Sequence, residues 1–198
     1  MTAVEFFYDF TSPYSYLAST WVDEVARRAG GEVRYRPFLL GAVFKATGNH
    51  GPLETPAKMA HLKVDLDRWA RRLGVPLVFP SAFPVSTVLA LRCALAAGRH
   101  GQLAPFTHAV FRACWTDGQD IASPEVLGRL AAGVGLPALV SEAPGEKDTL
   151  IRETTGAVER GAFGAPTFFV GTEMFVGNDR LDFVAEALRT ARGACPPS

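Results

Sequence analysis

The sequence is poor in cysteine and has no recognisable thiol or metal motif of its own. It has three cysteines in 198 residues, at positions 93, 114 and 195, and no two of them form a CxxC pair or a metal-ligand spacing. This scarcity argues against a disulfide framework and favours a reducing compartment. We expect these three side chains to take no part in the chemistry, and we expect no metal site.

An excess of charge of either sign is also absent. Lys plus Arg and Asp plus Glu both count 20, which gives no support to a nucleic-acid or membrane-surface partner. Glu5 and Asp9 interrupt the first apolar run, so it does not read as a signal peptide. No later apolar run reaches the roughly 18 residues that a membrane span needs. We therefore expect a cytoplasmic protein.

The order of the expected elements indicates an α/β protein. Val4 to Tyr8 reads as a strand that is buried on both faces, and a helix from Pro13 to the Gly30-Gly31 pair leads to a second strand at Val33 to Phe38. Two strands joined by a crossover helix form a right-handed parallel βαβ unit. Strands return only at Pro166 to Val170 and Glu173 to Val176, with Gly171-Thr172 as a type II′ hairpin turn, before a last helix.

The middle of the chain is expected to be helical. Gly41 to Pro56 reads as a turn or short helix followed by a loop. Helices are expected at Met59 to Leu73, Val85 to Ala97, Leu103 to Cys114, Pro124 to Ala132 and Lys147 to Arg160. This order predicts a thioredoxin-like domain, formed by residues 1–45 and 145–198, that is interrupted by an all-helical insertion of residues 46–144.

The segment Ser12-Pro13-Tyr14-Ser15 stands where the first strand meets the first helix. With cysteine at both serine positions it would carry the CxxC redox motif of thioredoxin-like proteins. A Ser-Pro pair at a helix start is in general only an N-cap, whose hydroxyl accepts the N–H of Ser15. At this junction the hydroxyl can also donate to a sulfur anion. We therefore predict that the thiol arrives with a ligand and that Ser12 stabilises its thiolate.

A covalent role for Ser12 as an acyl-enzyme nucleophile is the competing chemical interpretation. The sequence has no GxSxG elbow, and no histidine lies in a recognisable partner motif. The histidines at positions 50, 61, 100 and 108 are scattered and read as surface or structural residues.

Gly164-Ala165-Pro166-Thr167 opens the late strand. A proline there is in general a ladder-end residue with a trans bond. In thioredoxin-like folds the equivalent proline is cis and faces the start of the first helix. We therefore predict a cis Ala165-Pro166 bond, with the backbone of Ala165 available to pair with a thiol ligand.

Six stretches together resemble one family. The sequence resembles the 2-hydroxychromene-2-carboxylate isomerases and, more broadly, the kappa-class glutathione transferases, both of which share the DsbA-like thioredoxin fold with a helical insertion. The matching stretches are YDFTSPYSYLA (Tyr8 to Ala18), KATGN (Lys45 to Asn49), LKVDLDRWA (Leu62 to Ala70), PLVFP (Pro76 to Pro80), FGAPTFFVG (Phe163 to Gly171) and MFVGNDRL (Met174 to Leu181).

The resemblance implies glutathione as the cofactor and Ser12 as the catalytic residue. It implies that Asn49, the Ala165-Pro166 backbone, Asn178 and Asp179 bind the tripeptide, the last two at its γ-glutamyl end. By themselves, Asn178 and Asp179 read as a helix cap. The implied reaction is reversible addition of the glutathione thiolate to a small aromatic substrate, bond rotation and elimination, without net oxidation. The resemblance also implies a homodimer.

Further residues are candidates for substrate contact, and other functions stay open. Tyr14 and Tyr16 can contact an aromatic substrate or pack, and Lys45, Lys58 and Lys63 can pair with a carboxylate or lie in solvent. The segment around Lys45 matches the isomerases less closely, so conjugation of aromatic electrophiles is an alternative to isomerisation. A thiol-disulfide oxidoreductase would need cysteine at position 12 or 15. A glutathione-binding module without catalysis is the remaining alternative.

Overall fold

The computed structural model describes residues 2–51 and 55–193, and a four-stranded sheet lies at its centre. The strands are β1 (Ala3–Tyr8), β2 (Glu32–Pro37), β3 (Thr167–Val170) and β4 (Glu173–Val176). Their order is β2-β1-β3-β4. β1 is parallel to β2, with Phe6 opposite Tyr35, and the pairs β1-β3 and β3-β4 are antiparallel. The four predicted strands are confirmed to within one residue at each end.

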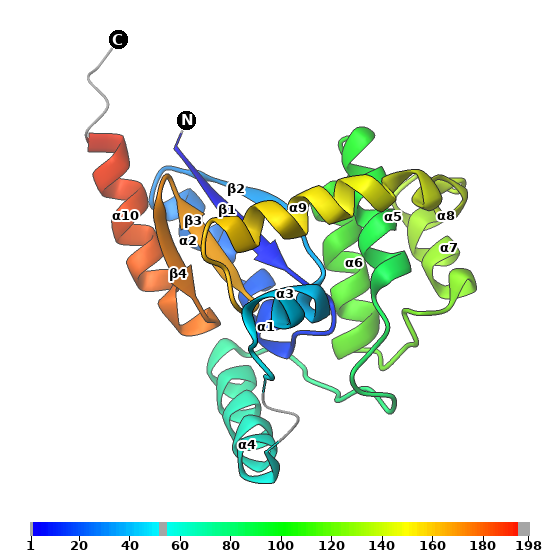
Figure 1. The fold of residues 1–198 in the computed structure, drawn as a ribbon, viewed down its shortest axis with the longest axis horizontal. Helices are drawn as coiled ribbons and strands as arrows, with labels where there is room; N and C mark the ends of the chain where they lie inside the picture. Colours follow the sequence, from blue (N-terminus) through cyan, green and yellow to red (C-terminus); the bar gives the residue numbers. More distant parts are fainter. Residues whose placement is uncertain (1, 52–54, 194–198) are drawn as a thin grey trace.

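Helices occupy most of the remaining chain (Figure 1). They are α1 (Pro13–Ser19), α2 (Val22–Arg28), α3 (Leu40–Thr47), α4 (Pro56–Leu73), α5 (Val88–Arg99), α6 (Leu103–Trp115), α7 (Pro124–Gly133), α8 (Leu139–Glu142), α9 (Lys147–Glu159) and α10 (Leu181–Gly193). Short 3₁₀ turns, η1 (Ala143–Glu146) and η2 (Asn178–Arg180), precede α9 and α10. Figure 1 shows α9 crossing the sheet, α5 to α8 gathered at one end, α10 at the other end and α4 projecting below the sheet. Within the described residues, every helix is too short or too polar to cross a membrane.

The first helix is divided, which differs from the prediction of one helix up to Gly30. α1 ends at Ser19 and α2 begins at Val22. The hydroxyls of Ser19 and Thr20 donate to the carbonyls of Tyr16 and Leu17, both at 2.7 Å. Such bonds compete with the helical backbone ladder, so they account for the break.

Other helix ends also differ from the prediction, and α4 begins at Pro56 rather than Met59. α5 begins at Val88 rather than Val85, and the Val85 N–H donates to Thr11 Oγ1 at 3.2 Å. The helix continues through Gly98, and Gly101, with a φ of 70°, takes the left-handed conformation beyond its end. α3 resolves the uncertain Gly41 to Pro56 segment as a helix that ends at Gly48, whose φ is 71°.

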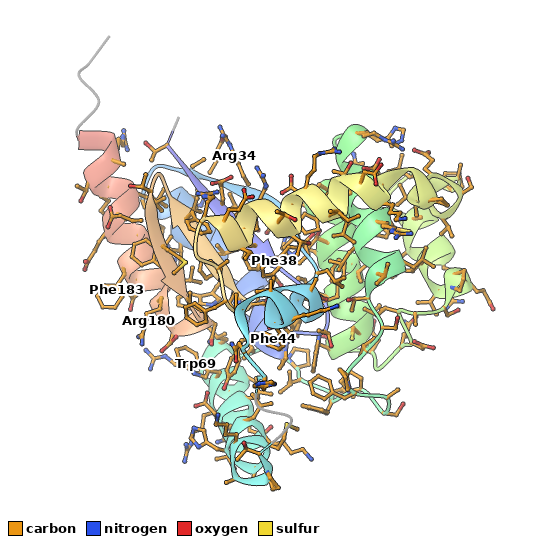
Figure 2. The ribbon with its side chains drawn as sticks, viewed as in Figure 1. Arg34, Phe38, Phe44, Trp69, Arg180 and Phe183 are labelled. Atoms are coloured by element: carbon orange, nitrogen blue, oxygen red, sulfur yellow. The ribbon has the colours of Figure 1, made fainter. Side chains whose placement is uncertain are left out.

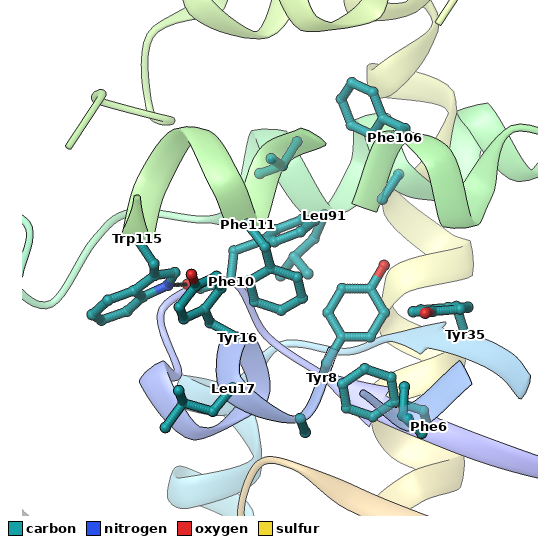
Figure 3. Packing of buried hydrophobic residues seen from close by; sticks show 14 of the residues in the cluster. Phe6, Tyr8, Phe10, Tyr16, Leu17, Tyr35, Leu91, Phe106, Phe111 and Trp115 are labelled. Atoms are coloured by element: carbon teal, nitrogen blue, oxygen red, sulfur yellow. Dashed lines mark hydrogen bonds between the residues drawn. The ribbon is translucent and has the colours of Figure 1, made fainter. Parts of the chain in front are cut away.

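The apolar core covers both faces of the sheet, as the pattern of β1 predicts. Phe6 and Tyr8 join a large cluster with side chains of α5 and α6, while Phe7 and Phe169 pack with Phe38 on the opposite face. Figure 3 shows Tyr8, Phe10 and Phe111 packed together, with Trp115 donating from Nε1 to the Phe10 carbonyl at 2.8 Å. This packing fixes the end of β1, the point from which Ser12 is presented. The division into residues 1–45 and 145–198 against 46–144 stays a prediction.

Candidate active site

A cavity of about 490 Å³ opens beside the start of α1, a size typical of small-molecule sites. Its walls come from the β1-α1 junction, α3, α4, the segment before α5 and the segments that flank β3 and β4. Figure 2 shows Phe44, one wall residue, on α3. The lining residues are Thr11, Ser12, Pro13, Tyr14, Leu40, Gly41, Phe44, Asn49, Gly51, Leu62, Phe83, Pro84, Phe163, Gly164, Ala165, Val176 and Gly177.

Ser12 lies in this cavity and is only 4% exposed. Its Oγ accepts the backbone N–H of Ser15 at 3.1 Å, so Ser12 is the predicted N-cap of α1. The same hydroxyl donates to the carbonyl of Ala165 at 3.0 Å, across 153 positions of sequence. The hydroxyl is therefore both a helix cap and a polar donor on the cavity wall.

The Ala165-Pro166 bond is cis, as predicted from the fold resemblance. Ala165 lines the cavity next to Ser12, whose hydroxyl donates to the Ala165 carbonyl. Pro166 is buried, and its own carbonyl accepts the N–H of Gly177 at 3.0 Å. The cis bond near the start of α1 is thus confirmed, whereas the Ala165 carbonyl, which was predicted to be open to a ligand, accepts the Ser12 hydroxyl. A second cis bond, Phe83-Pro84, lies in another wall and was not predicted.

Asn49 also lies in the cavity wall. Its Nδ2 donates to the carbonyl of Phe163 at 2.8 Å, and its Oδ1 accepts the N–H of Gly51 at 3.0 Å. These bonds tie the loop after α3 to the segment before the cis proline. An amide NH₂ has two N–H groups, and the bond to Phe163 uses one of them.

Acidic side chains border the cavity near Tyr14. The Tyr14 hydroxyl donates to Oδ2 of Asp65 on α4 at 2.7 Å. Burial, this bond and the charges of Asp65 and Asp179 raise the pKa of Tyr14 well above its usual range, so it stays protonated at neutral pH. Asp179 lies beside Gly177, a lining residue of the cavity. Its Oδ1 is only 2.5 Å from the position that a Cβ on Gly177 would occupy. Its Oδ2 is 3.1 Å from Nη1 of Arg180.

The helix-cap interpretation of Asn178 and Asp179 is wrong. They form the 3₁₀ turn η2, and neither side chain caps it. Asn178 is 2% exposed, and its Nδ2 has no hydrogen-bond partner among the described residues. Asn178 does not line the cavity, whereas Asp179 lies at its edge.

The remaining substrate candidates lie outside the cavity lining. Lys45 is exposed on α3, and Nζ of Lys63 lies 5.7 Å from the centroid of the Phe79 ring. Lys58 lines a separate depression with His61, Tyr14 and Leu62. The hydroxyl of Tyr16 donates to the Pro76 carbonyl at 2.6 Å, and its ring stacks on Trp115, so Tyr16 is a packing residue. Of the five residues proposed for substrate contact, therefore, Tyr14 alone lines the cavity.

Asp9 supports the site from behind and was not predicted as a site residue. It is 1% exposed, and its carboxylate accepts the N–H groups of Leu40 at 2.8 Å and Thr11 at 3.1 Å. Burial raises the pKa of Asp9, although bonds from Leu40, Thr87, Thr11 and Phe10 oppose the rise. An Asp directly after a strand buried on both faces was the available signal, because such a carboxylate needs several donors.

The apolar cavity walls were also missed by the sequence analysis. Phe44, Phe83, Phe163 and Val176 come from four separate segments. Phe163 is 45% exposed, so part of its ring faces solvent. That exposure is a property of the folded chain, so the sequence held no signal for it.

The two described cysteines are buried in α5 and α6, and neither lines the cavity. Burial raises the pKa of Cys93 and of Cys114 to about 12. Neither thiol is therefore ionised at neutral pH. Cys195 lies outside the described residues.

The fold and the cavity define the class of protein. Residues 3–189 match the model of the DsbA-like thioredoxin domain, and the chain belongs to this family. Its relatives include a 2-hydroxychromene-2-carboxylate isomerase of Sphingobium xenophagum, 37% identical over 93% of this chain and 97% of the relative. The kappa-class glutathione S-transferase 1 of Homo sapiens is 27% identical over 98% of this chain and 95% of the relative.

Structural neighbours agree with this assignment. A 2-hydroxychromene-2-carboxylate isomerase structure superposes with a TM-score of 0.87 and 33% identity, covering 96% of this chain and 97% of that one. A probable DsbA oxidoreductase of Streptomyces coelicolor superposes with a TM-score of 0.79 at 20% identity, covering 100% and 93%, which shows a shared fold. The relatives therefore support an enzyme of the isomerase or glutathione-transferase type.

Proposed function

We propose that this protein is a glutathione-dependent isomerase of aromatic intermediates of the 2-hydroxychromene-2-carboxylate type. The observation that carries the proposal is the position of the Ser12 hydroxyl, which lies in an apolar cavity and donates to the Ala165 carbonyl. The full-length similarity to isomerases of that name supports it. The cytoplasmic location and the homodimer stay predictions.

The residues around Ser12 fit a zwitterionic tripeptide with a thiol. The Asp179 carboxylate suits an ammonium group, while the Asn49 amide and the Ala165 backbone suit peptide groups. When bound, glutathione supplies the nucleophilic thiol that this chain lacks at positions 12 and 15. Cys93 and Cys114 do not replace it, because both are buried and un-ionised.

The Ser12 hydroxyl has one proton to donate, so its role depends on which group accepts that proton. That proton is donated to the Ala165 carbonyl. When a ligand N–H bonds to this carbonyl, the Ser12 proton becomes available to a sulfur anion. A hydrogen bond to a charged group is worth about 1.5–3 kcal/mol, which corresponds to roughly one to two pKa units of the thiol. Ser12 thereby favours the thiolate at neutral pH.

A kappa-class type of conjugation is the second candidate, supported by the relatives of that name. It would use the same site, because both reactions need an anionic sulfur beside an apolar acceptor. Assays of chromene isomerisation and of conjugate formation on the same preparation distinguish the two. Binding of glutathione without either reaction would leave a non-catalytic module.

A Ser12→Cys variant tests where the ligand sulfur lies without relying on turnover. The new thiolate would attack glutathione disulfide, form a mixed disulfide with one half and release the other as glutathione. We expect Ser12→Cys to react at least about tenfold faster with glutathione disulfide than with hydroxyethyl disulfide, because the site holds the tripeptide. Mass spectrometry measures the attached group.

Ser141→Cys is the matched control, since Ser141 is exposed on α8 and does not line the cavity. It should show no preference between the two disulfides beyond their intrinsic reactivity. Equal preference in both variants would contradict a glutathione site at Ser12.

A further inference from the structure

One wall of the cavity belongs to α4, the helix that projects from the rest of the molecule (Figure 1). α4 has 18 residues, and three of them are buried, Leu62, Leu66 and Ala70. These three belong to the large core cluster, and α4 packs against α1. Apolar burial is not directional, so this stripe alone does not fix where α4 lies on α1.

A directional contact is made by the side chain of Tyr14 at the start of α1. Its hydroxyl donates to Oδ2 of Asp65 at 2.7 Å. Among the described residues, this is the one hydrogen bond between a side chain of α4 and another element. The cation–π contact of Lys63 with Phe79 joins α4 only to the segment that follows it. The bond to Asp65 therefore fixes α4 against α1, and the raised pKa of Tyr14 keeps the donor protonated at neutral pH.

Tyr14 and Leu62 form a partition between two hollows of the surface. Both residues line the cavity of about 490 Å³ and also the depression of about 500 Å³ next to it. The depression is otherwise lined by residues of α4, among them Lys58 and His61. Leu62 precedes Asp65 by three residues, so the two side chains lie on the same side of α4. The hydrogen bond thus holds the two halves of the partition together.

We infer that the Tyr14–Asp65 hydrogen bond keeps this partition closed and limits the length of the electrophile that the cavity takes. Without the bond, α4 can move away from Tyr14, and the two hollows join. A longer electrophile then extends from the cavity into the depression. Tyr14 and Asp65 are positioning residues here, because they act through the place of Leu62. The inference rests on the proposed function only in taking the cavity as the site of the electrophile.

Amide hydrogen exchange of the full chain, without any ligand, tests whether the bond holds α4. Tyr14→Phe keeps the ring and removes the donor, and Asp65→Ala removes the acceptor. We expect exchange in α4 to become at least about tenfold faster in both variants, because each loses a hydrogen bond to a charged group. Asp65→Asn should stay close to wild type, because its amide oxygen still accepts the Tyr14 proton. Unchanged exchange in Tyr14→Phe and Asp65→Ala would overturn the inference.

Tyr35→Phe is the matched control, because it removes a Tyr–Asp bond of the same kind elsewhere. The Tyr35 hydroxyl donates to Oδ2 of Asp23 at 2.6 Å, and Tyr35 lines neither the cavity nor the depression. This variant should leave exchange in α4 unchanged. Equally fast exchange of α4 in Tyr35→Phe would indicate a general loosening of the fold and would also overturn the inference.

Binding of two electrophile analogues of different length tests the limit itself. Cinnamate and 4-phenylcinnamate each carry one carboxylate and differ by one phenyl ring. Calorimetry with and without S-methylglutathione, which has no thiol to add to them, gives the ratio of their affinities. We expect Tyr14→Phe and Asp65→Ala to shift this ratio at least about tenfold towards 4-phenylcinnamate, because its second ring leaves water. Asp65→Asn and Tyr35→Phe should keep the wild-type ratio.

Both responses are required, so a change in exchange alone or in the ratio alone would overturn the inference, as would wild type that binds neither analogue. The outcomes are also distinct from those for the proposed function. If both responses are seen and Ser12→Cys shows no preference for glutathione disulfide, the inference stands and the glutathione proposal fails. If that preference is present and α4 does not respond, the glutathione site stands and the inference fails.

Discussion

The hydroxyl of Ser12 can donate only one hydrogen bond, and its present acceptor is the carbonyl of Ala165. Its lone pairs meanwhile accept the N–H of Ser15. The cap and the donor functions therefore do not compete, because they use different parts of the same hydroxyl. A single residue can hold α1 in place and act on a ligand.

Ser12→Ala should raise the pKa of the bound glutathione thiol by about one unit or more, because it removes a charge-assisted donor. We expect turnover near neutral pH to fall by roughly tenfold, while folding is kept and the tripeptide still binds. Ultraviolet thiolate absorbance measured against pH, with Ser141→Ala as the control, checks this. Identical titration curves for wild type and Ser12→Ala would remove Ser12 from the mechanism.

The buried carboxylate of Asp9 links three segments that line the cavity, two of them directly and the third through Thr11. It accepts the N–H of Leu40 at the start of α3 and that of Thr11 ahead of α1. Thr11 in turn accepts the N–H of Val85, in the segment that follows the cis Phe83-Pro84 bond. Asp9 is thus a positioning residue, because the walls it joins carry Ser12, Phe44 and Phe83.

Asp9→Asn should lower the free energy of unfolding by about 1–3 kcal/mol. The NH₂ group of the asparagine would face a backbone N–H where a carboxylate oxygen now accepts a hydrogen bond. The pKa of Asp9 is raised in the folded state, so the native protein keeps this proton to a higher pH than the unfolded chain. Wild type therefore loses stability as pH rises from the unfolded-state pKa of Asp9 towards its folded-state pKa. The difference in free energy of unfolding between wild type and Asp9→Asn narrows over the same pH range. Urea denaturation at several pH values measures it.

The exposed Asp182→Asn on α10 is the control for this variant, and it should change stability by less than about 0.5 kcal/mol. A gap between wild type and Asp9→Asn that widens with rising pH would contradict the raised pKa. No loss of stability at any pH would contradict the positioning role.

At the scale of the whole molecule, a polar cluster joins the sheet to the helices beyond it. The Tyr35 hydroxyl, on β2, donates to Oδ2 of Asp23 on α2 at 2.6 Å. Nε2 of His108, on α6, lies 3.2 Å from the same oxygen and 3.0 Å from the Tyr35 hydroxyl. The cluster therefore crosses between the sheet and the helical middle of the chain.

Burial alone would raise the pKa of Asp23, but the bonds from His108 and Tyr35 outweigh it, and the pKa is lowered. A carboxyl group whose pKa is lower in the folded than in the unfolded state adds stability at pH values above its unfolded-state pKa. This stability is lost as pH falls through the folded-state pKa. Asp23 is about half exposed, so solvent screening limits the effect of Asp23→Asn to less than about 1 kcal/mol near pH 6.

Denaturation of wild type and Asp23→Asn near pH 6 and near pH 2 measures this contribution, which should be absent at the lower pH. Asp148→Asn on α9 is the control, because Asp148 is exposed and no part of the cluster. A difference that grows as pH falls would refute the assignment.

The sequence alone determined the four strands, most helices and the cis Ala165-Pro166 bond near the start of α1, but not the hydrogen bond from Ser12 to the Ala165 carbonyl. Strand alternation and helical periodicity depend on which side chains turn inward, which is a local pattern. The position of Ser12 followed from the strand-to-helix junction, and the cis Ala165-Pro166 bond followed from the fold that this junction indicated. The break between α1 and α2 was missed, because it depends on which carbonyls the Ser19 and Thr20 hydroxyls reach.

Only the tertiary structure decided which apolar residues line the cavity and which fill the core. Phe44, Phe83 and Phe163 line it, whereas Phe6, Phe7 and Phe10 are fully packed, yet all six are phenylalanines in apolar stretches. Their difference is set by segments far apart in the chain that the fold brings together. The carboxylate of Asp9 is placed partly in the same way, because one of its donors, the N–H of Leu40, lies 31 positions away in the sequence.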